Sequence, residues 1–377
     1  MGIDHQKLEK LLGRVRQEVE DGLLPSVQVA LAFEGHIICE AAFGSVNGEV
    51  ASTENRYCFF SATKPLVASV VWQLIGEGEI EVQEKVVNYF PEFCRSDDVW
   101  KSAITVEQVM LHTAGFPLAP LGPPTWADRE ARIEKMQSWR VDWEPGTRYF
   151  YHPTSAHWVL AEIIERVTNN DYRSEVEARV TNPAGLPRLL GIPVDDQEDI
   201  STLVGVGKEA TADELEAVFG VRKMPDNGVT EDLLMNFNDP VNRAVGIPGG
   251  GGFGRARDLA LFYQELLHNP HDLWEPGLLG NVTGLVRNSL PDLAGCPANR
   301  TLGLVQAGAD GFANVRGFGR TVSARAFGHN GAAGQLAWAD PETGISIGYV
   351  TNGCDRHIIR MARRGTAIGS MAADCAT

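Results

Sequence analysis

The chain has 377 residues, of which 44% are hydrophobic and 22% are charged, so it can bury a large core. Its formal net charge of −16 at pH 7 disfavours binding to nucleic acid. No apolar run approaches the ~20 residues that a membrane-spanning helix needs, and residues 1–7 lack the apolar core of a signal peptide. The six cysteines are scattered without C-x-x-C spacing, which is typical of reduced thiols. We therefore expect a soluble cytoplasmic protein that binds neither nucleic acid nor membrane.

The N-terminal segment predicts a helix followed by a β-hairpin. Apolar residues recur at helical spacing from Leu8 to Val19, and Gly22 stops this pattern. Residues 27–33 then alternate as in a strand, Glu34-Gly35 forms a turn, and residues 36–43 return.

The tetrapeptide Ser61-Ala62-Thr63-Lys64 has the form S-x-x-K and opens an apolar helix that should end near Gly76. Residues i and i+3 share a helix face, so Ser61 Oγ and the Lys64 ammonium can form a hydrogen bond. Burial would lower the pKa of Lys64, and the helix N-terminus would favour negative charge on Ser61. This is the geometry of a nucleophile and its base, although an N-cap serine beside a surface lysine gives the same pattern.

Two later segments hold further candidate residues. Tyr149-Phe150-Tyr151-His152-Pro153 leads into a helix predicted over residues 156–167, and a phenol at such a junction can carry protons. Near the C-terminus, Phe327-Gly328-His329-Asn330-Gly331-Ala332 precedes a predicted hairpin over residues 335–351. A helix over residues 355–373 would complete one antiparallel sheet flanked by the terminal helices.

The segment 117–143 is rich in proline and holds Trp126, Trp139 and Trp143. Two interpretations stay open for it. The tryptophans either cover a cleft and contact an apolar part of a substrate, or they only pack the helical part of the protein.

In this order, the motifs resemble those of the serine β-lactamase and penicillin-binding protein superfamily. The similar branch contains class C β-lactamases, D-alanyl-D-alanine carboxypeptidases and family VIII carboxylesterases, and the chain is closest in character to the last. Further landmarks are the segment 111–117, the glycine run 248–254 and the residues 339–352. The resemblance spans nearly the whole chain and implies an α+β fold. Residues 1–87 and 321–377 would form a sheet domain, and residues 88–320 a mostly helical domain, with the site between them.

The resemblance also implies roles for individual residues. Ser61 would be the nucleophile that accepts the acyl group, and Lys64 its base or proton relay. Tyr151 would exchange protons with the leaving group and with water, which requires a pKa lowered by the nearby ammonium. His329-Asn330-Gly331 stands where β-lactamases have K-T-G, and the N–H groups of Ala332 and Ser61 would form the oxyanion hole.

Two departures from the family pattern bear on the substrate. Pro153 stands where the Y-x-N motif has an asparagine that helps to hold the lysine and binds amide groups. His329 replaces a permanent lysine charge with a group that is mostly neutral near pH 7. His329 alone does not decide, because some peptidases of the superfamily also have histidine there. Together the departures favour a small to medium, apolar, uncharged ester over a β-lactam or a D-alanyl peptide. We therefore expect a serine carboxylesterase, with Trp126, Pro153 and Cys58 as possible pocket residues.

Several alternatives stay open beside this function. The same acyl-enzyme could serve a D-amino-acid peptidase, a weak β-lactamase or an acyltransferase, and an inert scaffold could act as a binding or filament-forming module. The glycines of 249–254 match G-x-G-x-x-G without a βαβ unit and predict a tight turn. His152 with His157, and His268 with His271, lack a third ligand, so we predict neither metal nor cofactor. The oligomeric state does not follow from the sequence.

Overall fold

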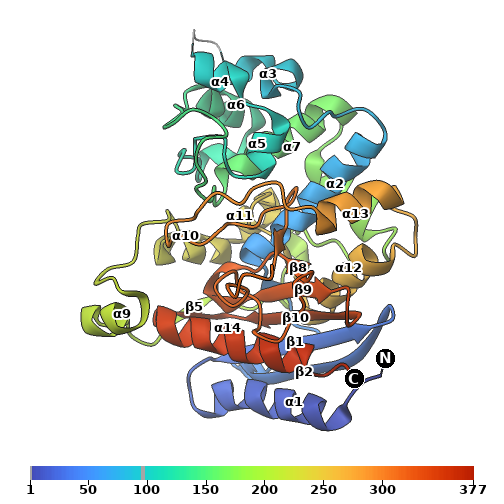
Figure 1. Cartoon of the computed structure of the whole chain (residues 1–377), viewed down its shortest axis with the longest axis vertical. Helices are drawn as coiled ribbons and strands as arrows, with labels where there is room; N and C mark the ends of the chain where they lie inside the picture. The colour runs from blue at the N-terminus through green and yellow to red at the C-terminus, as the bar shows by residue number, and fades with distance from the viewer. Residues whose placement is uncertain (1, 95–97) are drawn as a thin grey trace.

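The centre of the fold is a seven-stranded antiparallel sheet built mainly from the two ends of the chain (Figure 1). The structure is a computed structural model that describes residues 2–94 and 98–377, so the first predicted unit, 1–87, is described from Gly2 onward. The strands lie in the spatial order β3 (Glu49–Val50), β2 (His36–Val46), β1 (Ser26–Phe33), β10 (Ile345–Thr351), β9 (Leu336–Asp340), β8 (Phe327–Gly328) and β7 (Val305–Gln306).

The two predicted hairpins are confirmed and lie side by side in this sheet. Glu34 and Gly35 have positive φ values of 49° and 79°, as a two-residue turn between twisted strands requires. β1 then pairs with β10, with Val27 opposite Thr351, which joins the first hairpin to the last.

Helices cover both faces of the sheet. α1 (His5–Glu20) and α14 (Ile358–Ala373) pack on one face, where Val29 and Leu31 of β1 are buried. α12 (Ala256–His268) packs on the other face, against Ala30 and Ala32. Because successive side chains of a strand point to opposite faces, β1 is apolar at most positions.

The other helices form a part of the molecule that extends away from the sheet. In Figure 1, α3 to α7 lie at the opposite end of the molecule from α1, and α2 lies between. α2 is buried along almost its whole length and ends at Gly76, as predicted. The bounds are α2 (Lys64–Gly76), α3 (Val86–Tyr89), α4 (Val99–Ala103), α5 (Val106–Met110), α6 (Arg129–Gln137), α7 (Ser155–Thr168), α8 (Tyr172–Val176), α9 (Ala212–Phe219), α10 (Glu231–Met235), α11 (Pro240–Val245) and α13 (Pro276–Gly284).

Some boundaries differ from the prediction because short strands carry little periodic signal. The last helix begins at Ile358 rather than at residue 355, since β11 (Gly353–Asp355) pairs in parallel with β5 (Val204–Val206). A third small sheet joins β4 (Tyr57–Cys58) to β6 (Phe253–Gly254). β7 and α12 belong to the sheet layer although they lie within the range 88–320. The position 321 therefore does not separate the sheet from the helical part.

A buried ion cluster ties α1 to α14. The Arg364 guanidinium on α14 donates to Glu18 on α1 and, at 2.9 Å, to Asp355. Glu18 also pairs with Arg14, and Asp355 with Arg360, so each carboxylate has two cationic partners. None of the described helices is both long enough and apolar enough to cross a membrane.

Candidate active site

Ser61 lies at the junction between a short strand and a buried helix. A 3₁₀ turn at Phe60–Thr63 follows β4, and α2 begins at Lys64. Pro65 occupies the first turn of α2, as predicted, where its missing N–H leaves no bond unmade. Ser61 itself lies on the turn that leads into the helix and remains partly exposed. Phe60 has a φ of 47°, a left-handed conformation that bulky residues rarely adopt, directly before this serine.

Lys64 is fully buried, and three oxygen atoms surround its side-chain nitrogen. Nζ lies 3.2 Å from Ser61 Oγ, 2.7 Å from the Pro153 carbonyl oxygen and 2.6 Å from the Gly249 carbonyl oxygen. Burial lowers the pKa of Lys64 well below its usual value, and the positive charge of Arg300 lowers it further. A neutral amine has two N–H groups and one lone pair. It can therefore donate to the two carbonyls and accept the proton of Ser61.

Sequence reasoning missed the two carbonyl groups that hold Lys64. Pro153 lacks the asparagine side chain of Y-x-N enzymes, yet its backbone oxygen contacts the lysine. The glycine run forms the predicted tight turn, in which the Gly251 N–H donates to the Ile247 carbonyl at 2.7 Å. A Cβ on Gly249 would lie 3.1 Å from the Pro153 oxygen, so a small residue lets this turn approach Lys64. Side-chain patterns contain no information on backbone oxygens, which is why neither contact was expected.

Tyr151 donates a hydrogen bond from Oη to Ser61 Oγ at 2.8 Å. The segment 111–117 holds the tyrosine in place: the His152 N–H donates to His112 Nδ1 at 3.1 Å, and the Phe116 N–H donates to His152 Nε2 at 3.1 Å. The expectation of a lowered Tyr151 pKa is wrong. Burial raises the pKa of Tyr151 and outweighs the opposing effects of Arg300 and of the Ser61 hydrogen bond. Tyr151 is therefore a protonated donor in this structure.

Arg300 lies beside this constellation and was not among the predicted residues. Its Cζ is 5.1 Å from the ring centre of Tyr151 and 5.8 Å from that of Tyr149. Its Nε donates to Tyr149 Oη at 3.2 Å, and the residue is only 7% exposed. No motif contains Arg300, and it lies far from Tyr151 in the sequence, so the sequence pattern carries no signal for it.

The segment that follows β8 approaches Ser61 from the sheet. A Cβ on Gly331 would lie 2.1 Å from the Phe59 carbonyl oxygen, so the backbone of this segment is in contact with the segment before Ser61. The His329 ring centre lies 5.8 Å from that of Tyr151. Burial lowers the pKa of His329 well below its usual value, and the charge of Arg300 lowers it further, so the ring is neutral. The Asn330 side chain accepts from the Ala337 N–H at 2.9 Å and donates to the Gly317 carbonyl, which braces the loop.

The suggested pocket residues lie in packed positions. Trp126 is 1% exposed, and its Nε1 donates to Asn242 Oδ1 at 3.0 Å. Trp139 and Trp143 are also buried, which agrees with the interpretation that these tryptophans pack the helical part. Cys58 is fully buried, and burial raises the pKa of its thiol.

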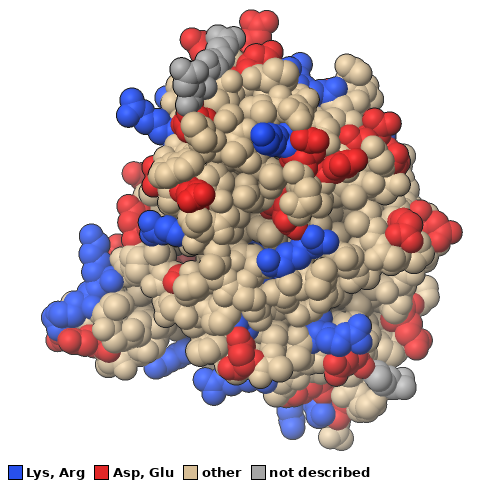
Figure 2. Space-filling model, turned by 45° about the horizontal axis from the view of Figure 1, so that its top comes forward, with Lys and Arg blue, Asp and Glu red and all other residues tan. Residues whose placement is uncertain are grey.

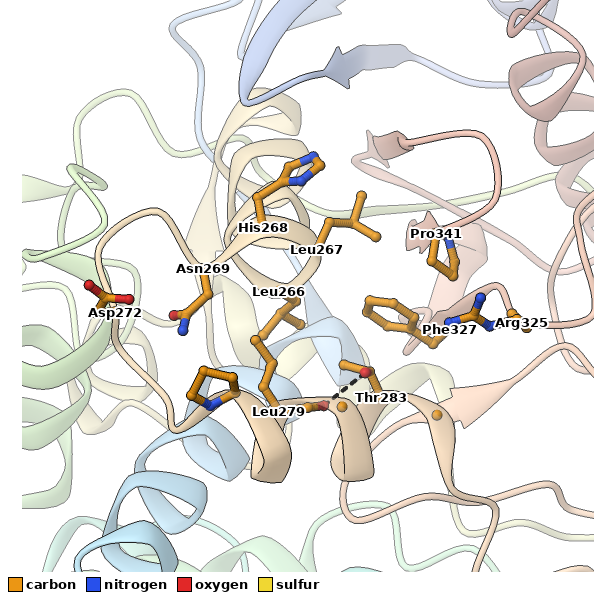
Figure 3. A pocket seen from close by; sticks show the side chains of 13 residues that line it. Leu266, Leu267, His268, Asn269, Asp272, Leu279, Thr283, Arg325, Phe327 and Pro341 are labelled. Atoms are coloured by element: carbon orange, nitrogen blue, oxygen red, sulfur yellow. Dashed lines mark hydrogen bonds between the residues drawn. The ribbon is translucent and has the colours of Figure 1, made fainter. Parts of the chain in front are cut away.

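A separate cavity of about 390 Å³ lies between α12, α13 and the segment around β8 (Figure 3). Figure 3 shows Leu266, Leu279 and Phe327 lining it, with His268 and Arg325 nearby. None of the residues around Ser61 lines this cavity. Among the residues that the structure describes, no three His, Cys, Asp or Glu side chains are placed to hold a metal ion.

Comparison with known proteins gives the family. The Beta-lactamase family matches residues 12–364 of the chain. The protein belongs to this Beta-lactamase family. A curated relative from Salmonella agona (strain SL483), provisionally named D-alanyl-D-alanine carboxypeptidase, is 24% identical over 382 residues, which cover 93% of this chain and 84% of the relative.

Solved structures of similar fold agree with membership of the Beta-lactamase family. A penicillin-binding protein homologue from Caulobacter crescentus has a TM-score of 0.78 at 23% identity, covering 98% of this chain and 99% of its own. A family VIII carboxylesterase has a TM-score of 0.79 at 22% identity, covering 100% of this chain and 99% of its own. At these identities the likeness concerns the fold. The predicted resemblance and the α+β class are thereby confirmed, and the protein is a serine hydrolase of the Beta-lactamase family.

Proposed function

We propose that this Beta-lactamase family member hydrolyses carboxylic esters through an acyl-enzyme on Ser61. One observation carries the proposal: Lys64 Nζ and Tyr151 Oη both contact Ser61 Oγ, at 3.2 Å and 2.8 Å. A serine becomes nucleophilic when an adjacent base can take its proton. Lys64 suits this task because burial lowers its pKa well below the usual value, which favours the neutral amine that can accept a proton.

In the acylation step, Ser61 Oγ attacks the ester carbonyl carbon while its proton moves to Lys64 Nζ. The backbone N–H groups of Ser61 and Ala332 would receive the oxyanion. When the C–O bond to the alcohol breaks, Tyr151 gives its proton to the leaving oxygen and takes up the proton held by Lys64. This role fits a tyrosine that is protonated before the reaction.

In deacylation the same groups act on water. A water molecule attacks the acyl carbon, and its proton passes to Lys64. Ser61 Oγ leaves the acyl carbon and recovers a proton, so the acid is released and the enzyme returns to its first state. If an alcohol or amine took the place of water, the same intermediate would give acyl transfer.

An uncharged ester fits the surroundings of Ser61 better than an anionic amide. Pro153 has no side-chain amide to bind a peptide or β-lactam side chain, and its carbonyl is already engaged by Lys64. His329 is kept neutral by burial, so the position that holds a lysine in K-T-G enzymes has no positive charge here. The structural likeness to a family VIII carboxylesterase supports the same substrate class.

A peptidase is the second candidate, because the Salmonella agona relative is provisionally named D-alanyl-D-alanine carboxypeptidase. The test compares p-nitrophenyl acetate and butyrate with nitrocefin and a D-alanyl-D-alanine peptide, on the wild type and on Ser61→Ala. We expect ester turnover that Ser61→Ala loses, with little cleavage of the two amides. Faster turnover of nitrocefin or peptide than of ester would overturn the ester assignment.

A fluorophosphonate label tests the inert-scaffold alternative. We expect one covalent adduct on Ser61, detected by peptide mass spectrometry and lost in Ser61→Ala. An unlabelled wild-type protein would contradict any serine hydrolase.

The cytoplasmic location and the lack of nucleic-acid or membrane partners stay predictions. Figure 2 shows positive and negative side chains interspersed over the face in view, rather than a basic patch there. Fractionation of the native cell, with the chain detected by antibody, would test the location.

A further inference from the structure

We propose that Arg300 is a positioning residue for the serine hydrolase, which orders Tyr151 against Ser61 through the face of the tyrosine ring. The inference rests on the proposed function. It concerns a residue that no motif contains and that is not among the hydrogen-bond partners of Ser61 Oγ in the described residues.

The Arg300 guanidinium lies over the rings of Tyr149 and Tyr151, and we call this arrangement the clamp. The guanidinium carbon lies 5.1 Å from the Tyr151 ring centre and 5.8 Å from the Tyr149 ring centre, distances at which a cation is attracted to an aromatic face. Nε donates to Tyr149 Oη at 3.2 Å, which fixes the guanidinium plane. Tyr151 can then turn its hydroxyl only toward a limited set of positions, and Ser61 Oγ occupies one of them at 2.8 Å.

The charge of Arg300 is not neutralised by a carboxylate. No ion pair found among the described residues includes Arg300, and its Nη1 is buried without a hydrogen-bond partner. A buried cation without a counter-charge is costly, so its retention beside the reacting groups calls for a function. The groups around it are Lys64, Tyr149, Tyr151 and the histidines His112, His157 and His329.

The positive charge of Arg300 lowers the pKa values of the basic side chains around it. Burial is the main cause of the lowered pKa of Lys64, and the Arg300 charge is the second cause. The pKa values of the three histidines are also lowered by burial and by Arg300, so these rings are neutral and add no positive charge beside Lys64. Besides holding Tyr151, Arg300 thus favours the neutral amine that can accept the Ser61 proton.

Binding of an anionic substrate is the competing role for such a residue. The contacts disfavour it, because Nε donates to Tyr149 Oη, the guanidinium carbon lies over two tyrosine rings and Nη1 is buried. These contacts leave only Nη2 for a substrate carboxylate, so the experiment includes an anionic ester to test this role.

The experiment measures kcat and KM against pH for p-nitrophenyl butyrate and for the anionic ester mono-p-nitrophenyl glutarate. The variants are Arg300→Met and Arg300→Lys. Arg132→Met is the matched control, because Arg132 is also a buried arginine over an aromatic ring, 5.1 Å from the Trp158 ring centre. Ser61→Ala tests the proposed function itself.

We expect Arg300→Met to lower kcat at least about tenfold for both esters. The acid limb of its kcat/KM profile should move to higher pH by about one unit, because removal of a nearby positive charge raises the pKa of Lys64. Arg300→Lys keeps the charge but not the planar clamp, so its acid limb should stay near that of the wild type while kcat falls. Arg132→Met should leave the acid limb in place.

Three results would overturn the inference. They are an unchanged kcat and acid limb in Arg300→Met, wild-type kinetics in Arg300→Lys, and a loss confined to KM for the anionic ester, which would make Arg300 a substrate-binding residue. If Arg300→Met does not fold, Arg300→Lys decides alone through its kcat. Activity that survives in Ser61→Ala would refute the proposed function instead, so the two failures can be told apart.

Discussion

Replacement of Lys64 by methionine gives the sharpest test of the mechanism, because the two side chains have similar length and the site is fully buried. The variant loses the group 3.2 Å from Ser61 Oγ that can accept the serine proton. A positioned base contributes a factor of about 10²–10⁴, which equals about 3–5 kcal/mol of transition-state stabilisation. We expect kcat for p-nitrophenyl butyrate to fall by this factor, with KM changed much less.

The same substitution should alter stability in a pH-dependent way. Methionine leaves the Pro153 and Gly249 carbonyls without their donor, and this loss of hydrogen bonds by itself costs about 1–3 kcal/mol. The pKa of Lys64 is lower in the folded protein than in the unfolded chain. Between these two values the unfolded chain binds more protons, so this lysine makes the wild type more stable as pH rises. Below the folded pKa that slope vanishes.

The measurement is urea unfolding of both proteins at several pH values from 7 to 9.5. The free energy of unfolding of the wild type minus that of Lys64→Met should rise with pH, with a slope of at most about 1.4 kcal/mol per pH unit. Use of the difference cancels the other titrating groups, including Lys101, whose pKa burial lowers to about 8. A pH-independent difference would refute the neutral amine, and a variant that keeps more than a tenth of wild-type kcat would refute Lys64 as the base.

Three further predictions concern single contacts. Tyr151→Phe removes the hydroxyl 2.8 Å from Ser61 Oγ, so kcat for p-nitrophenyl butyrate should fall by about 10²–10⁴, and a variant within threefold of the wild type would exclude Tyr151 as a proton carrier. Arg364→Met leaves the buried carboxylates of Glu18 and Asp355 with only Arg14 and Arg360 as partners. Urea unfolding should therefore show a loss of about 3 kcal/mol in the free energy of unfolding, with kcat unchanged in the folded fraction. Equal stability would contradict the role of this cluster. Gly348→Ala places a Cβ 1.9 Å from the Ala256 carbonyl oxygen, so α12 must move away from the sheet. The melting temperature should fall, because such overpacking lowers the free energy of unfolding by about 1–3 kcal/mol. An unchanged melting temperature would show that α12 can shift without cost.

Local interactions account for the parts of the site that were predictable. Ser61 and Lys64 are three residues apart, so helical geometry alone brings their side chains together. The hairpin at Glu34-Gly35 and the apolar stripe of α2 follow from backbone preference and periodicity in the same way. Tyr151 was found only because its motif resembles that of a known family, since no local rule relates it to Ser61.

Electrostatic environment was not predictable from the chain. The Tyr151 pKa was expected to fall because of a nearby ammonium, but burial raises it. A pKa depends on how much solvent and charge surround the group, and both are set by segments far apart in sequence. The same reason explains why Arg300 was missed.

The sequence by itself determined the family motifs, the elements with clear periodicity and the serine–lysine pair. Only the tertiary structure decided that Lys64 is held by the carbonyls of Pro153 and Gly249, and that Arg300 stands over Tyr151. Side-chain periodicity reports which face of an element is buried, whereas it contains nothing about which backbone oxygens or distant charges arrive at that face. These contacts arise when the glycine turn, the segment that carries Tyr151 and the segment that carries Arg300 pack together around the first turn of α2.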